Sequence, residues 1–263
     1  MNWVPLLFFD DVCHQLNYEA LNQVGQLFGS WSKFGSEHGE KRRELKFRCE
    51  LNGNQEVRYS LRKTDYSRKV TVADLNLEFD CITAFSCGFA LPKDHRVSLR
   101  EFERVVLPII APLVTNCCWP YLSPKRRDQH RFFFNAFKNC PGFNEIYIEE
   151  GEESRDFVTR QIELGNVQRL TLYGTKNWPE EEKLTETLKK FVSSMRFHKL
   201  YTRDLLRDDY ELFELFLERA LAKELKPRAC IVTAAGNLDK SRFLTLRPEY
   251  RSESRKDAWQ ITD

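Results

Sequence analysis

Apolar residues recur at three- and four-residue steps through the first 45 residues of the chain. This spacing lines one side of a helix with apolar groups and predicts short helices packed on one another. A charged run at residues 40–44 follows them. The apolar positions are Val12, Leu16, Leu21, Val24, Leu27, Phe28 and Trp31.

Between residues 45 and 63 the pattern changes to alternation of apolar and polar positions, the period of a half-buried strand. Two alternating runs flank the segment Asn52-Gly53-Asn54, and a turn that contains Asn-Gly predicts a β-hairpin. The change of period indicates a boundary between a helical module over 1–45 and an α/β region over 46–263. The apolar positions of the two runs are Leu45, Phe47, Cys49, Leu51, Val57, Tyr59 and Leu61.

The patterns over residues 70–142 are weaker. Residues 72–82 have the character of a strand, and residues 99–114 are apolar enough for a buried helix. Pro108 and Pro112 should break or kink that helix, because proline lacks the backbone N–H and clashes with the preceding turn. A further helix is predicted around the aromatic run Phe132, Phe133, Phe134 and Phe137.

From residue 143 onward, one spacing (apolar-x-x-apolar-x-apolar) recurs with starts at 143, 167 and 197 and a weaker copy at 227. Amphipathic helix patterns separate the copies, and such alternation predicts parallel β/α units. The repeat favours an irregular leucine-rich-repeat-like stack over a nucleotide-binding sheet. The predicted class is therefore α/β, a small helical module followed by this stack. The asparagine typical of such repeats is replaced by Gly151, Thr175 and Leu205.

Alternation along these predicted strands also defines a candidate partner-binding face, opposite the core. Tyrosine and arginine are the residues that dominate binding hot spots, so the face suits a protein partner. An ordinary solvated sheet face is the alternative, since tyrosine is also a good strand former. The predicted binding positions are Glu145, Tyr147, Arg169, Tyr173, Lys199, Tyr201 and Arg203, with Glu149 and Thr171 on the same face.

Composition excludes several classes of protein. Hydrophobic residues make up 41% and aromatic residues 13% of the 263 residues, which excludes a disordered chain. The 41 Lys and Arg against 39 Asp and Glu lack the basic excess of a nucleic-acid binder, so nucleic acid is not an expected partner. The run Lys125, Arg126, Arg127, His130 and Arg131 is accordingly interpreted as a solvated face rather than a phosphate site. No membrane span is expected, and the protein is predicted to be intracellular, in cytoplasm or nucleus.

The sequence offers no pattern of a known active site. A glycine-rich phosphate loop is missing, and the eight cysteines lack structural zinc spacing. The five histidines are scattered; Cys13 and His14 are neighbours, but adjacent residues on a helix point in different directions. We therefore expect a non-enzymatic protein with no cofactor and no metal, its cysteines behaving as small buried apolar groups.

The apolar spacing of the first 45 residues resembles the F-box, a short three-helix motif that opens with a Leu-Pro-like pair and ends on a tryptophan. Val4-Pro5 stands in place of that pair. Two positions depart from the motif, since Leu7 and Ala20 stand where acidic residues are usual. The whole layout, including the segment 157–179, resembles the F-box-like families of nematodes, in which a degenerate F-box precedes an F-box-associated α/β region.

The resemblance implies a substrate receptor of a cullin–RING ubiquitin ligase, which links a target protein to a Skp-type adaptor and raises its local concentration. Two alternatives remain. The first is a stand-alone leucine-rich-repeat-like interaction scaffold whose helices only cap the stack, and the second is a nucleic-acid-associated protein that uses residues 125–131. The implied adaptor-binding residues are Val4, Pro5, Val12, Leu16, Leu21, Val24, Leu27 and Trp31.

Overall fold

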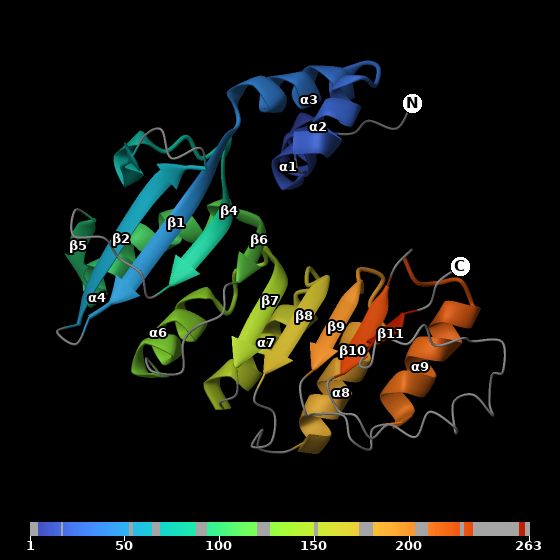
Figure 1. The fold of residues 1–263 in the computed structure, drawn as a ribbon. Helices are drawn as coiled ribbons and strands as arrows, with labels where there is room; N and C mark the ends of the chain where they lie inside the picture. The colour runs from blue at the N-terminus through green and yellow to red at the C-terminus, as the bar shows by residue number, and fades with distance from the viewer. Residues whose placement is uncertain are drawn as a thin grey trace. The chain divides into compact units, whose positions relative to one another are not determined.

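The N-terminal segment forms three short helices in the computed structural model: α1 (Leu6–Gln15), α2 (Tyr18–Gly25) and α3 (Ser30–Lys41) (Figure 1). Helices were predicted over this stretch, and they are observed. The structure describes residues 5–16, 18–52, 55–64, 69–87, 94–119, 127–149, 152–173, 181–202, 210–226, 229–233 and 258–260.

Strands β1 (Arg43–Leu51) and β2 (Glu56–Lys63) form the predicted antiparallel hairpin, with Leu45 opposite Lys63 and Leu51 opposite Val57. The alternating apolar side chains point to the buried side, as the period of two requires. Two short strands, β3 (Lys69–Val70) and β5 (His95–Ser98), pair with β2 on its other edge, both antiparallel.

The strand predicted over 72–82 is wrong over residues 72–79 and is observed only from residue 80. Residues Val72–Asp74 form a 3-10 turn, η1, because the Asp74 carboxylate accepts hydrogen bonds from the backbone N–H and the hydroxyl of Thr71 in a capping box. The strand β4 begins later, at Asp80, and extends to Cys87. It pairs in parallel with β1, and β6 (Val114–Trp119) pairs in parallel with β4.

The predicted buried helix over 99–114 forms an irregular helical segment. It consists of α4 (Leu99–Glu101), a π-helical stretch η2 (Phe102–Val106), α5 (Leu107–Ile110) and a 3-10 turn η3 (Ala111–Leu113). Pro108 lies in the first turn of α5 and Pro112 lies in η3, so the last two of the three changes of helix type lie beside a residue without a backbone N–H. Phe102 packs against Phe47 and Tyr59 and covers the inner side of the hairpin.

The chain divides into two compact units, Met1–Cys118 and Trp119–Asp263. The first unit contains the helical module and strands β1 to β5. Within this unit, the change from helix to strand falls at residues 41–43.

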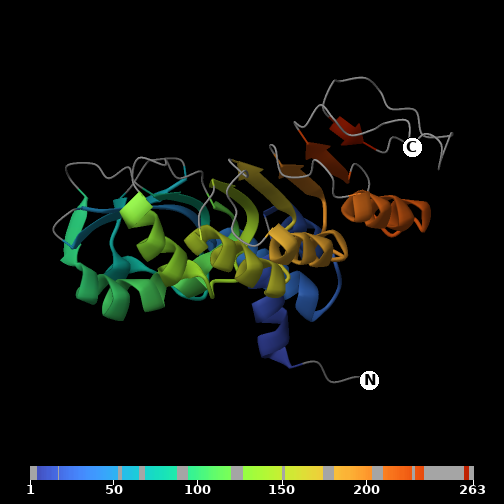
Figure 2. The same ribbon diagram turned by 90° about the horizontal axis from the view of Figure 1, so that it is seen from below.

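In the second unit, β7 (Phe143–Glu149), β8 (Arg169–Tyr173) and β9 (Lys199–Thr202) are adjacent parallel strands, as predicted. The weak fourth copy also forms a strand, β10 (Cys230–Thr233), parallel to β9, and β11 (Ala258–Gln260) pairs antiparallel with it. Helices α6 (Arg127–Phe137), α7 (Glu152–Glu163), α8 (Glu181–Val192) and α9 (Tyr210–Leu221) follow one another along one side of these strands (Figure 2).

The core of the second unit lies between these strands and helices. Trp119 is fully buried there, with its ring 4.6 Å from that of Phe157 and 5.0 Å from that of Phe143. Leucine and isoleucine side chains of β7 to β9 point to the same side. The opposite side of these strands carries no helix from α6 to α9 and presents the alternate side chains (Figure 2).

Candidate interaction surfaces

The helical module has a small core of its own. The Phe9 ring lies 4.5 Å from that of Trp31 and stacks on Phe34 at 5.9 Å. Helices α2 and α3 approach so closely at Gly35 that a Cβ there would lie 2.7 Å from the backbone nitrogen of Gly25. Glycine at this position therefore permits the backbone contact between the two helices.

The adaptor-binding residues implied by the F-box resemblance occupy different environments. Leu21 is completely buried, so it serves the core of the module rather than a direct contact. Pro5 and Leu27 are exposed, and Val4 lies outside the described residues. Half-buried positions are Val12, Leu16, Val24 and Trp31.

Large apolar side chains remain exposed around this core. Phe28 is 96% exposed and Leu7 is 74% exposed, and Phe8 lies against Trp31 with its ring 6.2 Å away. Exposed apolar groups gathered on one small module indicate a contact surface, because soluble proteins rarely leave such patches free. We call Leu6, Leu7, Phe8, Leu27 and Phe28 the module patch.

Sequence reasoning found only Leu27 and Phe28 of this patch. It counted both as part of the apolar stripe, and Leu27 was also one of the adaptor-binding residues implied by the F-box resemblance. Leu7 was considered only as a residue that departs from the F-box pattern. The available signal was the run of four apolar residues from Leu6 to Phe9, which is more than one helix face can bury.

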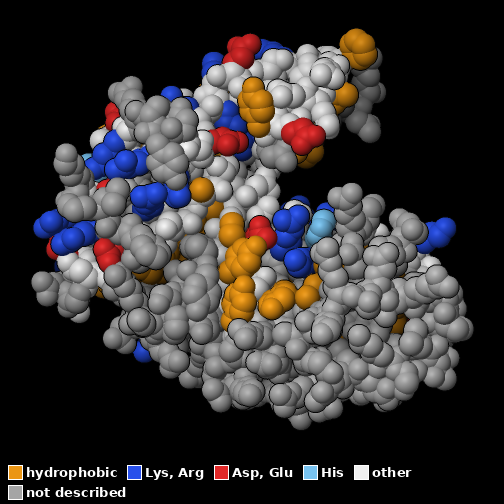
Figure 3. Space-filling model, viewed as in Figure 1, with side chains coloured by type: hydrophobic (Ala, Val, Ile, Leu, Met, Phe, Trp, Pro, Cys, Tyr) orange, Lys and Arg blue, Asp and Glu red, His pale blue; other side chains and the backbone are white. Residues whose placement is uncertain are grey.

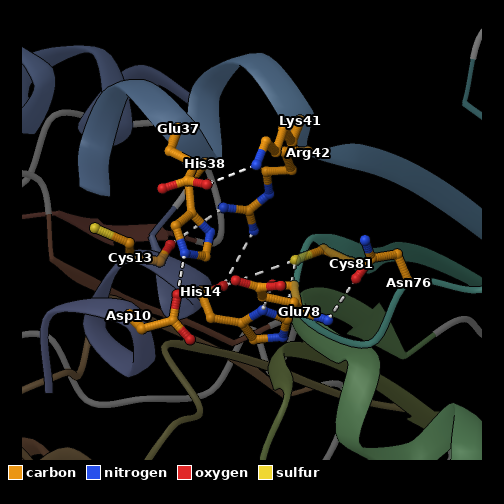
Figure 4. A network of polar contacts seen from close by, with 10 residues as sticks. All are labelled: Asp10, Cys13, His14, Glu37, His38, Lys41, Arg42, Asn76, Glu78 and Cys81. Atoms are coloured by element: carbon orange, nitrogen blue, oxygen red, sulfur yellow. Dashed lines mark hydrogen bonds and ion pairs between the residues drawn. The ribbon is translucent and has the colours of Figure 1, made fainter. Parts of the chain in front are cut away.

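A network of polar contacts fixes the helical module to the strand region of the same unit (Figure 4). Within the module, the buried His38 contacts Asp10 through Nε2 at 2.7 Å. Arg42 follows α3 and donates to the carbonyl oxygens of Cys13 and His14. The ring of His14 in turn hydrogen-bonds the carbonyl oxygen of Glu78 through Nδ1, at 3.1 Å.

The network also places Cys81, in β4, 4.0 Å from Nε2 of His14, a pair that sequence reasoning did not find because 67 residues separate the two. A nucleophilic cysteine needs an accessible thiolate. Cys81 is only 1% exposed, and burial raises the pKa of its thiol to about 11. The arrangement therefore supports a structural thiol that contacts the His14 ring and carbonyl.

On the second unit, the predicted partner-binding residues lie together on the side of β7 to β9 opposite the helices α6 to α9. The Tyr147 hydroxyl donates to the carboxylate of Glu145 at 2.7 Å, and Arg169 lies 3.8 Å from the same carboxylate. The rings of Tyr173 and Tyr201, on neighbouring strands, are 5.9 Å apart. Apart from the buried Thr171, these side chains are partly exposed. We call Glu145, Tyr147, Arg169, Tyr173, Lys199 and Tyr201 the tyrosine face.

Arg203 lies outside the described residues, and the side chain of Glu149 is not described. His198, which sequence reasoning left unassigned, precedes β9 beside Arg169 and Lys199. Partial burial, followed by the charges of Arg169, Lys226 and Lys199, lowers the pKa of His198 below its ordinary value of 6.5. The surroundings of His198 are therefore electropositive, and Glu145 offsets this only in part.

Among the described residues, no group of His, Cys, Asp and Glu is arranged to hold a metal ion. None of the helices described is both long and apolar enough to cross a bilayer. No model of a known protein family matches the chain, and no curated protein matches it.

Proposed function

We propose that the protein is a non-enzymatic substrate receptor that links a target protein to a Skp-type adaptor of a cullin–RING ubiquitin ligase. The single observation that carries the proposal is the module patch on a helical module whose core is already filled by Phe9, Trp31 and Phe34. Phe8 also contacts the rings of Phe9 and Trp31, whereas Leu7 and Phe28 are the most exposed side chains of the patch and are available for a partner.

The patch also distinguishes this proposal from the stand-alone scaffold. A cap exists to shield the apolar end of a stack, and its own apolar side chains should then be covered. Leu6 is instead 64% exposed and Phe28 is 96% exposed. A module that presents such side chains is better suited to bind a second protein.

The second unit supplies the proposed recognition domain. Parallel strands in chain order, with α7, α8 and α9 side by side on one face, support a leucine-rich-repeat-like stack in which the helix-free side holds the captured protein. The tyrosine face offers aromatic anchors and both signs of charge, a composition typical of protein interfaces.

The proposal is tested by measuring binding of the purified chain to a purified Skp-type adaptor. A Leu7→Asp, Phe28→Asp variant should bind at least about tenfold more weakly, because each substitution places a charge in the buried interface. Both side chains are largely exposed, so the variant should fold, which circular dichroism checks. The matched control is Met195→Asp, since Met195 is 88% exposed and lies in the second unit.

Binding by the wild type and the control, and loss in the double variant, support the receptor. If the wild type does not bind the adaptor, the ubiquitin-ligase proposal fails and the stand-alone scaffold replaces it. Equal binding by all three proteins would place any adaptor contact away from the module patch and remove the observation on which the proposal depends.

A further inference from the structure

The outer side of the β1–β2 hairpin and its two edge strands carries an unusual concentration of basic side chains. The inner side is covered by the irregular helical segment through Phe102, so the alternate residues point away from that core. In the space-filling view, Lys and Arg side chains gather over this part of the molecule (Figure 3). We call Lys46, Arg48, Arg58, Arg62, Lys69 and Arg96 the cationic sheet face.

The strand register places like charges directly opposite one another. Lys46 on β1 is opposite Arg62 on β2, and Arg62 is opposite Lys69 on β3. At the other end of β2, Arg58 lies between Arg96 on β5 and Glu50 on β1, and Glu56 lies 3.9 Å from Arg96. Like charges in directly opposite positions repel one another, so the row Lys46, Arg62 and Lys69 is the most strongly cationic part of the face. An anionic partner is attracted to such a row.

Two of these guanidinium groups also retain unused hydrogen-bonding capacity. The Nε–H groups of Arg58 and Arg62 are withdrawn from solvent, and neither has a hydrogen-bond partner within the described part of the chain. A guanidinium group is a planar fork of donors that fits a carboxylate with two parallel hydrogen bonds. The side chains of Arg58 and Arg62 are partly exposed, so the accessible part of each guanidinium group can receive an acceptor that a partner supplies.

We propose that the cationic sheet face binds an acidic segment of a partner polypeptide, with Arg58 and Arg62 as the central contacts. The acidic residues Glu50 and Glu56 lie on the same side of the hairpin, and a continuous phosphate backbone would meet repulsion there. Over β1 to β5, the described part of this face has no exposed aromatic ring on which a base could stack. A polypeptide with spaced carboxylates avoids both difficulties, and this site is independent of the module patch and of the tyrosine face.

The test is fluorescence anisotropy of the full chain with a short labelled peptide rich in Asp and Glu, at physiological ionic strength. The variant Arg58→Gln, Arg62→Gln should bind about tenfold more weakly, the loss expected when charge-assisted hydrogen bonds are removed. The matched control, Lys33→Gln, Lys190→Gln, removes the same charge from exposed positions on α3 and α8 and should leave affinity unchanged. Added salt should weaken wild-type binding.

Thermal unfolding shows whether the arginine variant is folded. Absence of peptide binding by the wild type overturns the proposal. So does equal weakening in the variant and the control, which would reveal attraction by net charge alone. Stronger binding of a labelled single-stranded oligonucleotide than of the peptide would assign the face to nucleic acid instead.

Discussion

At the scale of single residues, His198 is a pH-sensitive group beside Arg169 and Lys199 of the tyrosine face. Its pKa is lowered by burial and by the charges of Arg169, Lys226 and Lys199. On acidification the unfolded chain therefore takes up a proton at His198 before the folded chain does. The free energy of unfolding falls as the pH drops below 6.5, the ordinary value for histidine.

We predict that His198→Gln removes this part of the acid sensitivity. Chemical denaturation of the wild type and the variant between about pH 5 and pH 8 measures it, since histidine changes charge in that range. The difference in unfolding free energy between the two proteins should change with pH. Toward acid pH, the unfolding free energy of the variant should fall less than that of the wild type. A difference that does not vary with pH would contradict the prediction.

Sequence reasoning at this scale succeeded where a regular period determined direction. Strand alternation placed Tyr147, Tyr173 and Tyr201 on one side of the sheet, and the structure confirms it. It could not find the cationic sheet face, because Lys46, Arg62 and Lys69 become neighbours only through the pairing of β1, β2 and β3. The periodicity argument also assigned apolar residues to the core, so it missed Leu6, Leu7 and Phe8.

At the scale of elements, the crossing of α2 and α3 depends on the lack of a side chain at Gly35. A Cβ there would lie 2.7 Å from the Gly25 nitrogen and 2.9 Å from a methyl group of Val24. Gly35→Ala should therefore destabilise the chain by about 1 to 3 kcal/mol, because the backbones must separate. Denaturant unfolding followed by circular dichroism measures the loss.

Gly39 gives the control for this prediction, since it lies in the same helix with open space around its Cβ position. Gly39→Ala should be neutral or should stabilise the helix by about 0.5 to 1 kcal/mol. If the two variants had equal stability, the close approach of α2 and α3 would not be a constraint on the module.

Element prediction worked for patterns that local chemistry determines. The alternation around Asn52-Gly53-Asn54 predicted the β1–β2 hairpin, and the repeated spacing predicted β7, β8 and β9. The error at residues 72–74 came from the Thr71–Asp74 capping box, which a count of apolar residues does not detect. The helix at 99–113 was predicted with its proline interruptions, but its π-helical stretch was not.

At the scale of the whole molecule, target capture and adaptor binding should be separable. The variant Tyr147→Ala, Tyr173→Ala, Tyr201→Ala removes the aromatic anchors of the second unit, and none of the three side chains is part of the buried core. We predict that it loses its captured protein in affinity purification from cells and keeps wild-type affinity for the adaptor. Unchanged capture would place target recognition on another surface.

The order of the strands in the second unit has a consequence for how such a chain forms and diversifies. Because β7, β8, β9 and β10 are neighbours in the same order as in the sequence, each new strand finds its partner only one β/α unit away. Short separations between contacting segments favour fast folding, with growth along the sheet from any unit that forms first. Deletion of an internal β/α unit would bring together two strands of the same direction, and they could still pair in parallel. Duplication or loss of a unit in the gene can therefore change the number of strands while the topology stays the same.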